Sequence, residues 1–309
     1  MTMKKVVQKF LRRSSFIIPV PLLFRLGAAM RRARHRASKN RHLELPCRVL
    51  DFLCCSLSPK LVLRRISCGA EILALWVRVN DPSHYDLVNG NYETVVLQWL
   101  RNNLNPGETF WDVGANVGFY AIVAAKSLGP EGQVVAVEAD PDTAKILANN
   151  FEINHLTNAH VVSAALTDTI GTVRFGRAPA TGWSGIYYEN AEEWVSVEAL
   201  TGDALMKSLS LDQVHAIKID VEGSEAHVLK GMAGILMQNR PRLLIEVHRT
   251  YAGVEDQVAA ILDNGNFECN VLDQADATMH LAATPSRQPE SAGHRRRHSF
   301  NIDLSPECK

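Results

Sequence analysis

Residues Thr109–Gly118 read TFWDVGANVG and decide the fold of this chain. A short apolar run, interrupted by Asp112, ends in Gly114 and Gly118, and an apolar helical pattern follows from Phe119 to Leu128. Strand, glycine turn and helix in this order open a nucleotide-binding α/β unit. Glycine permits a sharp turn and lets a ligand approach the backbone, and the helix directs its amide donors at that ligand. The stretch therefore predicts a ligand site at the end of a central strand.

The glycine spacing is G-x-N-x-G, which differs from the G-x-G-x-x-G of dinucleotide-binding enzymes. A second predicted strand, Gln133–Val137, ends in Glu138, which follows Gly114 by 24 residues. At this separation such folds place a carboxylate that accepts hydrogen bonds from both hydroxyls of a ribose. The spacing therefore predicts a ribose-containing ligand.

Strands and helices alternate from Phe110 to Leu272, which predicts a mostly parallel sheet with helices on both faces. A hairpin of Leu61–Ile66 and Glu71–Val79 and a helix around Val95–Leu104 are expected before it, and Phe300–Leu304 is expected to be the last strand. The other predicted elements are helices Cys47–Leu57, Asp142–Asn154, Ala226–Met237 and Val254–Leu262, and strands His160–Ala165, Thr172–Phe175, Ala216–Val221, Leu243–Val247 and Phe267–Leu272.

The charge of the chain is unevenly distributed. Lys and Arg together number 33, as do Asp and Glu, so the formal net charge is zero. Because residues 1–41 are strongly basic, the remainder is net acidic, which argues against nucleic acid as the main substrate. The 6 cysteines form no CxxC pair and no zinc-site spacing, which indicates reduced thiols and a cytoplasmic protein.

The basic segment surrounds an apolar core, Phe16–Phe24, that contains Pro19 and Pro21. This core is too short for a transmembrane helix, and the arginines after it are atypical of a signal peptide. Two interpretations stay open. The segment is either a solvated extension or a peripheral contact with anionic lipid.

A second group of polar residues follows two later strands. Ala216–Val221 runs into the sequence IDVEGSE, which contains Asp220 and Glu222, and LLIEVH ends in Glu246 and His248. Because the carboxyl ends of parallel strands meet at one edge of a sheet, these side chains are expected beside the glycine turn.

Together these segments resemble the FkbM family of S-adenosylmethionine-dependent methyltransferases. The resemblance implies an α/β, Rossmann-like class I methyltransferase with a mostly parallel seven-stranded sheet, helices on both faces and an antiparallel last strand. It also implies O-methylation of a hydroxyl on a sugar, glycan or secondary metabolite. The matching pieces run in the family's order from Gly90 to His248: GNYE, PGETFWDVGANVGFYAIVAA, VVAVEADP, NNFEIN, IKIDVEGSEAHVLKG and LLIEVH.

The resemblance also suggests three regions and one departure. Residues 1–45 are expected to be a basic, partly disordered extension, 46–105 a hairpin and helix that pack on the catalytic domain, and 106–309 the methyltransferase domain. In Glu198–Asp203, EALTGD, the aspartate stands later than in the family's tLDel segment, so the substrate side of this region is expected to differ.

The resemblance places S-adenosylmethionine at the glycine turn. The backbone of Gly114–Gly118 would approach its methionine part, and Glu138 would hold its ribose. Asp112 would face the amino group and Glu93 would close the pocket. Asp168 would lie near the adenine amine, unless it is only a turn residue. The cofactor-binding candidates are Glu93, Asp112, Gly114, Ala115, Asn116, Gly118, Glu138 and Asp168.

Methyl transfer to a hydroxyl needs positioning, exclusion of water, and a group that takes the proton. One interpretation makes His248 the general base, oriented by a carboxylate. A second makes Asp220, Glu246 and His248 ligands of Mg²⁺ or Mn²⁺. A third assigns Glu222 and Glu225 only to capping of the next helix. The catalytic candidates are His248, Asp220, Glu222 and Glu246.

The expected partners are a small-molecule or glycan acceptor and no nucleic acid. The rival interpretation is a non-catalytic S-adenosylmethionine-binding protein localised by its basic tail. An NAD-dependent oxidoreductase is disfavoured, because the turn lacks the middle glycine and because IDVEGSE would then be unexplained. The sequence names neither the acceptor nor the oligomeric state.

Overall fold

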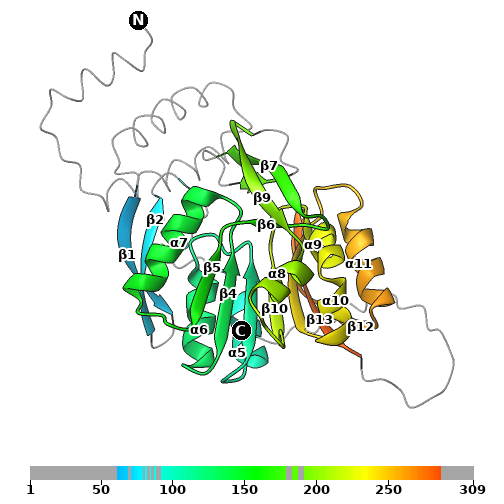
Figure 1. The fold of residues 1–309 in the computed structure, drawn as a ribbon, viewed down its shortest axis with the longest axis horizontal. Coiled ribbons are helices and arrows are strands. Elements are labelled where there is room, and N and C mark those ends of the chain that lie inside the picture. Colours follow the sequence, from blue (N-terminus) through cyan, green and yellow to red (C-terminus); the bar gives the residue numbers. More distant parts are fainter. Residues whose placement is uncertain are drawn as a thin grey trace, which may run out of the picture.

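The computed structural model describes residues 61–68, 71–78, 81, 84, 87, 92–178, 183–186 and 191–286 (Figure 1). The expected basic extension, the helix at Cys47–Leu57 and the strand at Phe300–Leu304 lie outside the described residues. The helices are α5 (Thr94–Asn103), α6 (Phe119–Leu128), α7 (Pro141–Ile153), α8 (Gly202–Ser208), α9 (Glu225–Gly231), α10 (Ala233–Gln238) and α11 (Val254–Asn264).

The main sheet has seven strands in the order β12-β13-β11-β10-β3-β4-β5. They are β3 (Thr109–Val113), β4 (Gln133–Val137), β5 (Ala159–Val162), β10 (Ala216–Ile219), β11 (Arg242–His248), β12 (Phe267–Gln274) and β13 (Thr278–Pro285). Neighbouring strands from β5 to β11 are parallel, and β13 is antiparallel to both β11 and β12. The predicted mostly parallel seven-stranded sheet with an antiparallel last strand is confirmed.

The sequence analysis missed one antiparallel strand, β13 (Thr278–Pro285). The last strand that we expected, Phe300–Leu304, lies outside the described residues and stays a prediction. Alanine and proline are poor strand formers, so local propensity hides β13. Pairing on both sides, with β11 and β12, makes it a strand. Tertiary contacts therefore override the local signal here.

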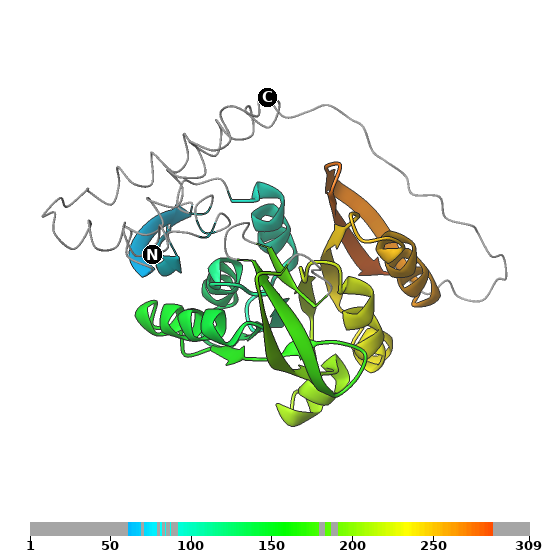
Figure 2. The same cartoon turned by 90° about the horizontal axis from the view of Figure 1, so that it is seen from above.

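Helices cover both faces of the sheet, as predicted (Figure 2). On one face the buried residues of α5, α6 and α7 form a single apolar cluster with Phe110 and Val134. On the other face the buried residues of α8 to α11 pack with Trp111 and Ile217. All but the first residue of β3 and of β4 is buried, which is typical of central parallel strands.

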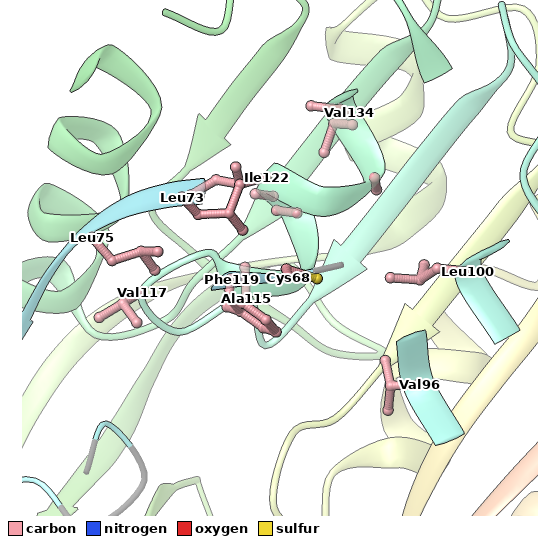
Figure 3. Close-up of a cluster of buried hydrophobic side chains, with 14 of the residues drawn as sticks. Cys68, Leu73, Leu75, Val96, Leu100, Ala115, Val117, Phe119, Ile122 and Val134 are labelled. Atoms are coloured by element: carbon pink, nitrogen blue, oxygen red, sulfur yellow. The ribbon is translucent and has the colours of Figure 1, made fainter. Parts of the chain in front are cut away.

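The predicted hairpin is formed by β1 (Leu61–Cys68) and β2 (Glu71–Arg78) and adds to the first cluster. Leu73 and Leu75 of β2 lie among the same buried side chains as Phe119 and Ile122 (Figure 3). The hairpin therefore shares the apolar core of α5, α6 and α7. The exact domain boundaries stay a prediction.

The helix expected at Ala226–Met237 is divided at Met232 into α9 and α10. The cause is a contact that is remote in sequence. The carboxylate of Asp203 accepts hydrogen bonds from the backbone N–H groups of Gly234 (2.8 Å) and Ile235 (2.9 Å), which starts a new helix there.

A smaller sheet, β6-β9-β7-β8, stands above the carboxyl ends of the main strands (Figure 1). Its strands are β6 (Ala165–Leu166), β7 (Gly171–Ala178), β8 (Trp183–Gly185) and β9 (Glu193–Leu200). The sequence predicted only part of β7, Thr172–Phe175, and missed β8 and β9, which both pair with β7.

The first test concerns the anchor between the hairpin and α7. The amide of Asn150, fully buried, accepts from Trp76 N–H (2.6 Å) and donates to the carbonyls of Trp76 (3.1 Å) and Val117 (2.8 Å). At roughly 1 kcal/mol for each hydrogen bond, Asn150→Ala is expected to lower the free energy of unfolding by about 3 kcal/mol. Urea denaturation measures this change.

Asn149→Ala, at an exposed position of the same helix, is the matched control and should change stability by less than about 0.5 kcal/mol. Equal effects of the two substitutions would contradict the anchor.

Candidate active site

A cavity of about 490 Å³ lies at the carboxyl ends of β3, β4 and β10, beneath the smaller sheet. The chain leaves β3 toward β4 on one side and β10 lies on the other, so this is a topological switch point, where ligands bind in open α/β sheets. Five of the candidates from the sequence line it: Gly114, Asn116, Glu138, Asp220 and Glu222.

The glycine turn is shaped by packing against its neighbours. Gly114 has φ 81°, and a Cβ there would stand 1.8 Å from the carbonyl oxygen of Asp220. Gly118 has φ 88°, and its Cβ would stand 2.2 Å from Leu147 of α7. A side chain at Gly114 would require a backbone shift, and at Gly118 the left-handed φ and the contact with Leu147 both favour glycine. The two glycines thus set the turn against β10 and α7, and Gly114 also lines the cavity.

A histidine that the sequence analysis missed fixes Asn116 in this turn. His84 is buried, and its Nδ1 accepts a hydrogen bond from the backbone N–H of Arg78 (2.9 Å). The proton of the neutral ring therefore sits on Nε2, which donates to Oδ1 of Asn116 (2.8 Å). The N-terminal hairpin thereby holds one wall of the cavity.

Glu138 lies at the end of β4, where the sequence placed it. Its carboxylate accepts from the backbone N–H groups of Asn116 (2.8 Å) and Asp140 (2.8 Å), one at each oxygen. Each oxygen keeps a second lone pair, so the carboxylate can still accept from two ribose hydroxyls. Burial raises the pKa of Glu138 to about 7.

Asp140 and Arg177 join the smaller sheet to the floor of the cavity. Asp140 caps α7 by accepting from the N–H groups of Asp142 and Thr143. The other carboxylate oxygen of Asp140 lies 2.6 Å from Nε of Arg177 on β7. The cap was detectable, because an aspartate before a proline is a typical helix start. The ion pair could not be detected from the sequence, because Arg177 stands 37 residues after Asp140 and belongs to a separate sheet.

The walls between these polar groups are apolar and suit a flat ring such as adenine. They are formed mainly by Val137, Ala139, Leu166, Phe175 and Ile186.

The other cofactor candidates lie outside the cavity lining. Asp112 is 1% exposed and faces Lys218, with 3.5 Å between Oδ1 and Nζ. Asp168 pairs with His227 of α9 (2.9 Å). Glu93 precedes α5 and accepts a hydrogen bond from the Tyr120 hydroxyl (3.0 Å). Ala115 and Gly118 serve packing of the turn.

The four catalytic candidates do lie together, around His248. Nε2 of His248 is 3.2 Å from Glu222, 3.9 Å from Glu246 and 4.0 Å from Asp220. Nδ1 is 2.7 Å from Glu225, which the sequence analysis had considered only as a helix cap. Glu225 also accepts from the N–H of Gly223, so a buried carboxylate fixes both the ring and the turn that carries Glu222.

These contacts decide the protonation of His248. Burial opposes the imidazolium, but the hydrogen bond to Glu225 and the charges of Asp220 and Glu222 outweigh it and raise the pKa of His248 to about 10. Burial raises the pKa of Glu222 to about 7 and that of Glu246 to about 8. The carboxylates around His248 therefore include groups that titrate near neutral pH.

Lys218 supplies the permanent positive charge beside this cluster. It lies directly opposite Asp112 in the sheet, and its Nζ is 3.2 Å from Asp220. Burial opposes the ammonium, but Asp220 and Asp112 outweigh it and hold the pKa of Lys218 above its usual range. The pKa of Asp220 is lowered because Lys218 and His248 outweigh its burial. Burial dominates at Asp112 and raises its pKa.

Comparison with known proteins gives the family. The model of the FkbM methyltransferase domain matches residues 112–269, just over half of the chain. The chain belongs to the FkbM methyltransferase family. The predicted family is thus confirmed, and S-adenosylmethionine is its cofactor.

Two curated relatives and one solved structure show the range of similarity. Hexuronic acid methyltransferase AglP of Haloferax volcanii is 29% identical over 53% of this chain, and the match spans 64% of that relative, less than two thirds of its length. Methyltransferase sdnD of Sordaria araneosa is 24% identical, over 54% of this chain and 76% of that protein. The crystal structure of methyltransferase FkbM from Methylobacillus flagellatus is 16% identical with a TM-score of 0.44, covering 65% of this chain and 54% of that one.

None of the described helices combines the length and the hydropathy needed to cross a membrane. The cytoplasmic location and the lipid contact of residues 1–45 stay predictions.

The second test follows the charge of His248. Its ring is expected to stay an imidazolium up to about pH 10, and ¹⁵N NMR of labelled histidine reads this directly. Because the folded pKa lies above the unfolded value, this stabilisation is complete below about pH 6.5 and is lost as the pH rises through about 10. Glu225→Gln should lower the pKa toward the ordinary value. A neutral ring at pH 7 in the unsubstituted protein would contradict this assignment.

Proposed function

We propose that this protein transfers a methyl group from S-adenosylmethionine to an oxygen of a sugar, a glycan or a related secondary metabolite. One observation carries the proposal: the cofactor-sized cavity with Glu138 on its wall shares Asp220 and Glu222 with the His248 cluster. The methyl donor and the hydroxyl that accepts the methyl group would therefore meet at one edge of the sheet.

The cavity fits the cofactor in chemistry as well as size. Pockets for drug-sized ligands measure about 300–1,000 Å³, and this cavity measures about 490 Å³. Glu138 would hold the ribose, and the apolar wall with Phe175 would receive the adenine. Asp220 and Glu222 give the other end of the cavity a negative charge, which suits the sulfonium and ammonium groups. When bound, S-adenosylmethionine supplies an electrophilic methyl group.

Glu222 is the residue that we propose as the proton acceptor. It lines the cavity, and its pKa of about 7 suits a general base. His248 is an imidazolium in the free protein, so it has no lone pair for the proton of a hydroxyl. Instead it would orient Glu222 across the 3.2 Å contact, while Glu225 fixes the ring from the other side. This assignment keeps all the predicted acidic candidates near the reaction but moves the base from His248 to Glu222.

The backbone supports this role for Glu222. Its φ is 53°, a left-handed conformation that is uncommon for a residue with a side chain. A Cβ on Gly185 of β8 would stand 3.2 Å from the Glu222 carbonyl, so the smaller sheet packs closely over this turn. Strained residues of this kind are concentrated at functional sites.

The acceptor class rests on the family relatives. AglP is named for the methylation of a hexuronic acid, which supports a sugar-derived acceptor here. Nucleic acid remains disfavoured by the acidic composition of the chain after its basic start.

The third test concerns the cofactor. Glu138→Gln removes the charge that receives the ribose hydroxyls and places an amide donor there, so we expect S-adenosylmethionine to bind at least tenfold more weakly by isothermal titration calorimetry. Glu152→Gln, an exposed glutamate on α7, is the matched control and should bind normally. Unchanged binding by Glu138→Gln would remove Glu138 from the site, and a response to NAD instead would overturn the proposed cofactor.

The fourth test concerns the base. With labelled S-adenosylmethionine and a panel of hexuronic acids, neutral sugars and glycan extracts, Glu222→Gln should lower kcat by about 10²-fold or more while cofactor affinity changes little. In the unsubstituted enzyme, kcat should rise with pH through about 7, and this rise should vanish in Glu222→Gln. Glu268→Gln, exposed on β12, should behave as the unsubstituted enzyme does. Normal turnover in Glu222→Gln would return the role of base to another group.

A further inference from the structure

A second cluster lies beside the His248 cluster and shares Glu246 with it. It consists of Glu93 before α5, Glu246 on β11 and His280 on β13. Glu246 and His280 lie directly opposite each other in the antiparallel pair of strands. Three elements that are far apart in sequence therefore bring two carboxylate oxygens and one imidazole nitrogen close together.

The distances between these atoms suit a shared ion better than direct hydrogen bonds. Nε2 of His280 is 3.8 Å from Oε1 of Glu93 and 3.8 Å from Oε2 of Glu246, which is beyond hydrogen-bond range. Two ligands of an ion at about 2.0–2.2 Å stand roughly 3.0–4.2 Å apart, depending on the angle at the ion. The three ligand atoms lie within 4.8 Å of one another, which leaves room for an ion between them.

The imidazole gives an independent indication of a ligand. His280 is 6% exposed, and its Nε2 has no hydrogen-bond partner among the described residues, although it points between two carboxylates. A buried nitrogen without a partner costs about 1–3 kcal/mol, so a native site usually satisfies it. The Tyr120 hydroxyl occupies Oε2 of Glu93 and leaves Oε1 facing His280.

The charges of the surrounding cluster also favour a cation. Six carboxylates each lie within 4.0 Å of a nitrogen of Lys218, His248 or His280. They belong to Glu93, Asp112, Asp220, Glu222, Glu225 and Glu246. With His248 protonated and His280 neutral, as a metal ligand must be, six acidic groups face two cationic ones. Charges removed from water need compensation, which a divalent ion would provide.

We infer that Glu93, Glu246 and His280 bind a divalent transition-metal ion. Two carboxylate oxygens and one imidazole nitrogen suit Mn²⁺ or Zn²⁺ better than Mg²⁺ or Ca²⁺, which prefer oxygen alone. Glu93 is 41% exposed, so water reaches the site and can complete the coordination. The ion would tie α5 to the last strands of the sheet. Its binding is independent of the proposed methyl transfer, because it needs neither cofactor nor acceptor.

The fifth test measures Mn²⁺ binding to the full-length, chelator-treated protein. Free Mn²⁺ is followed by its electron paramagnetic resonance signal, and we expect one saturable site that Zn²⁺ displaces. His280→Gln and Glu93→Gln should each weaken binding at least tenfold. Circular dichroism tests whether each variant is folded. Glu93→Gln should disturb the core less than His280→Gln, because the Glu93 side chain is partly exposed.

Two control variants make the result specific. His227→Gln removes another imidazole that pairs with a carboxylate, on Asp168, outside this cluster, and should leave Mn²⁺ binding unchanged. His248→Gln separates this site from the alternative trio of Asp220, Glu246 and His248, and it too should retain the binding.

Absence of saturable Mn²⁺ and Zn²⁺ binding in the unsubstituted protein would overturn the inference. So would unchanged binding in His280→Gln, or a loss in His248→Gln as large as the loss in His280→Gln. Because these measurements use no methyl donor, a failure here would leave the proposed transfer standing, and a failure of transfer would leave this site standing.

Discussion

The buried ammonium of Lys218 is the interaction on which the site depends. It stands between Asp112 on β3 and Asp220 at the end of β10, at 3.5 Å and 3.2 Å. Without this cation, several acids would have to share a water-poor sheet edge, and they would be protonated rather than charged. The cation lowers the pKa of Asp220, so that a carboxylate can remain ionised beside the cavity.

The same strand end connects the cofactor cavity to the acidic cluster. Gly114 packs so closely on the backbone of Asp220 that no side chain fits between them. The residues that follow, Glu222 and Glu225, are held by the turn and by His248. Movement of the glycine turn would therefore displace Asp220 and Glu222 as well. The two halves of the proposed reaction are thus parts of one packed unit, which favours accurate positioning over adaptability.

Much of this arrangement was predictable from the sequence, for physical reasons. Apolar runs with polar ends predicted the central strands, and the positions of Glu138, Asp220, Glu246 and His248 at the carboxyl ends of those runs placed them at one edge. The contributions of Lys218 and His280 were not predictable in this way. Each lies inside a strand, where a single sequence shows only a polar residue among apolar ones, and its partners become visible only with the strand order and register.

The departure of this chain from the family pattern near Asp203 has a structural explanation. The late aspartate was expected to alter the substrate side, but its carboxylate caps α10, on the face of the sheet covered by α8 to α11. A Cβ on Gly234 would stand 2.9 Å from that carboxylate, so the helix start and the aspartate fit each other. Asp203 is also absent from the lining of the cavity. A shifted aspartate in this segment therefore adjusts helix packing behind the sheet, and differences in acceptor choice within the family are better sought in the smaller sheet, whose Phe175, Arg177 and Ser184 do line the cavity.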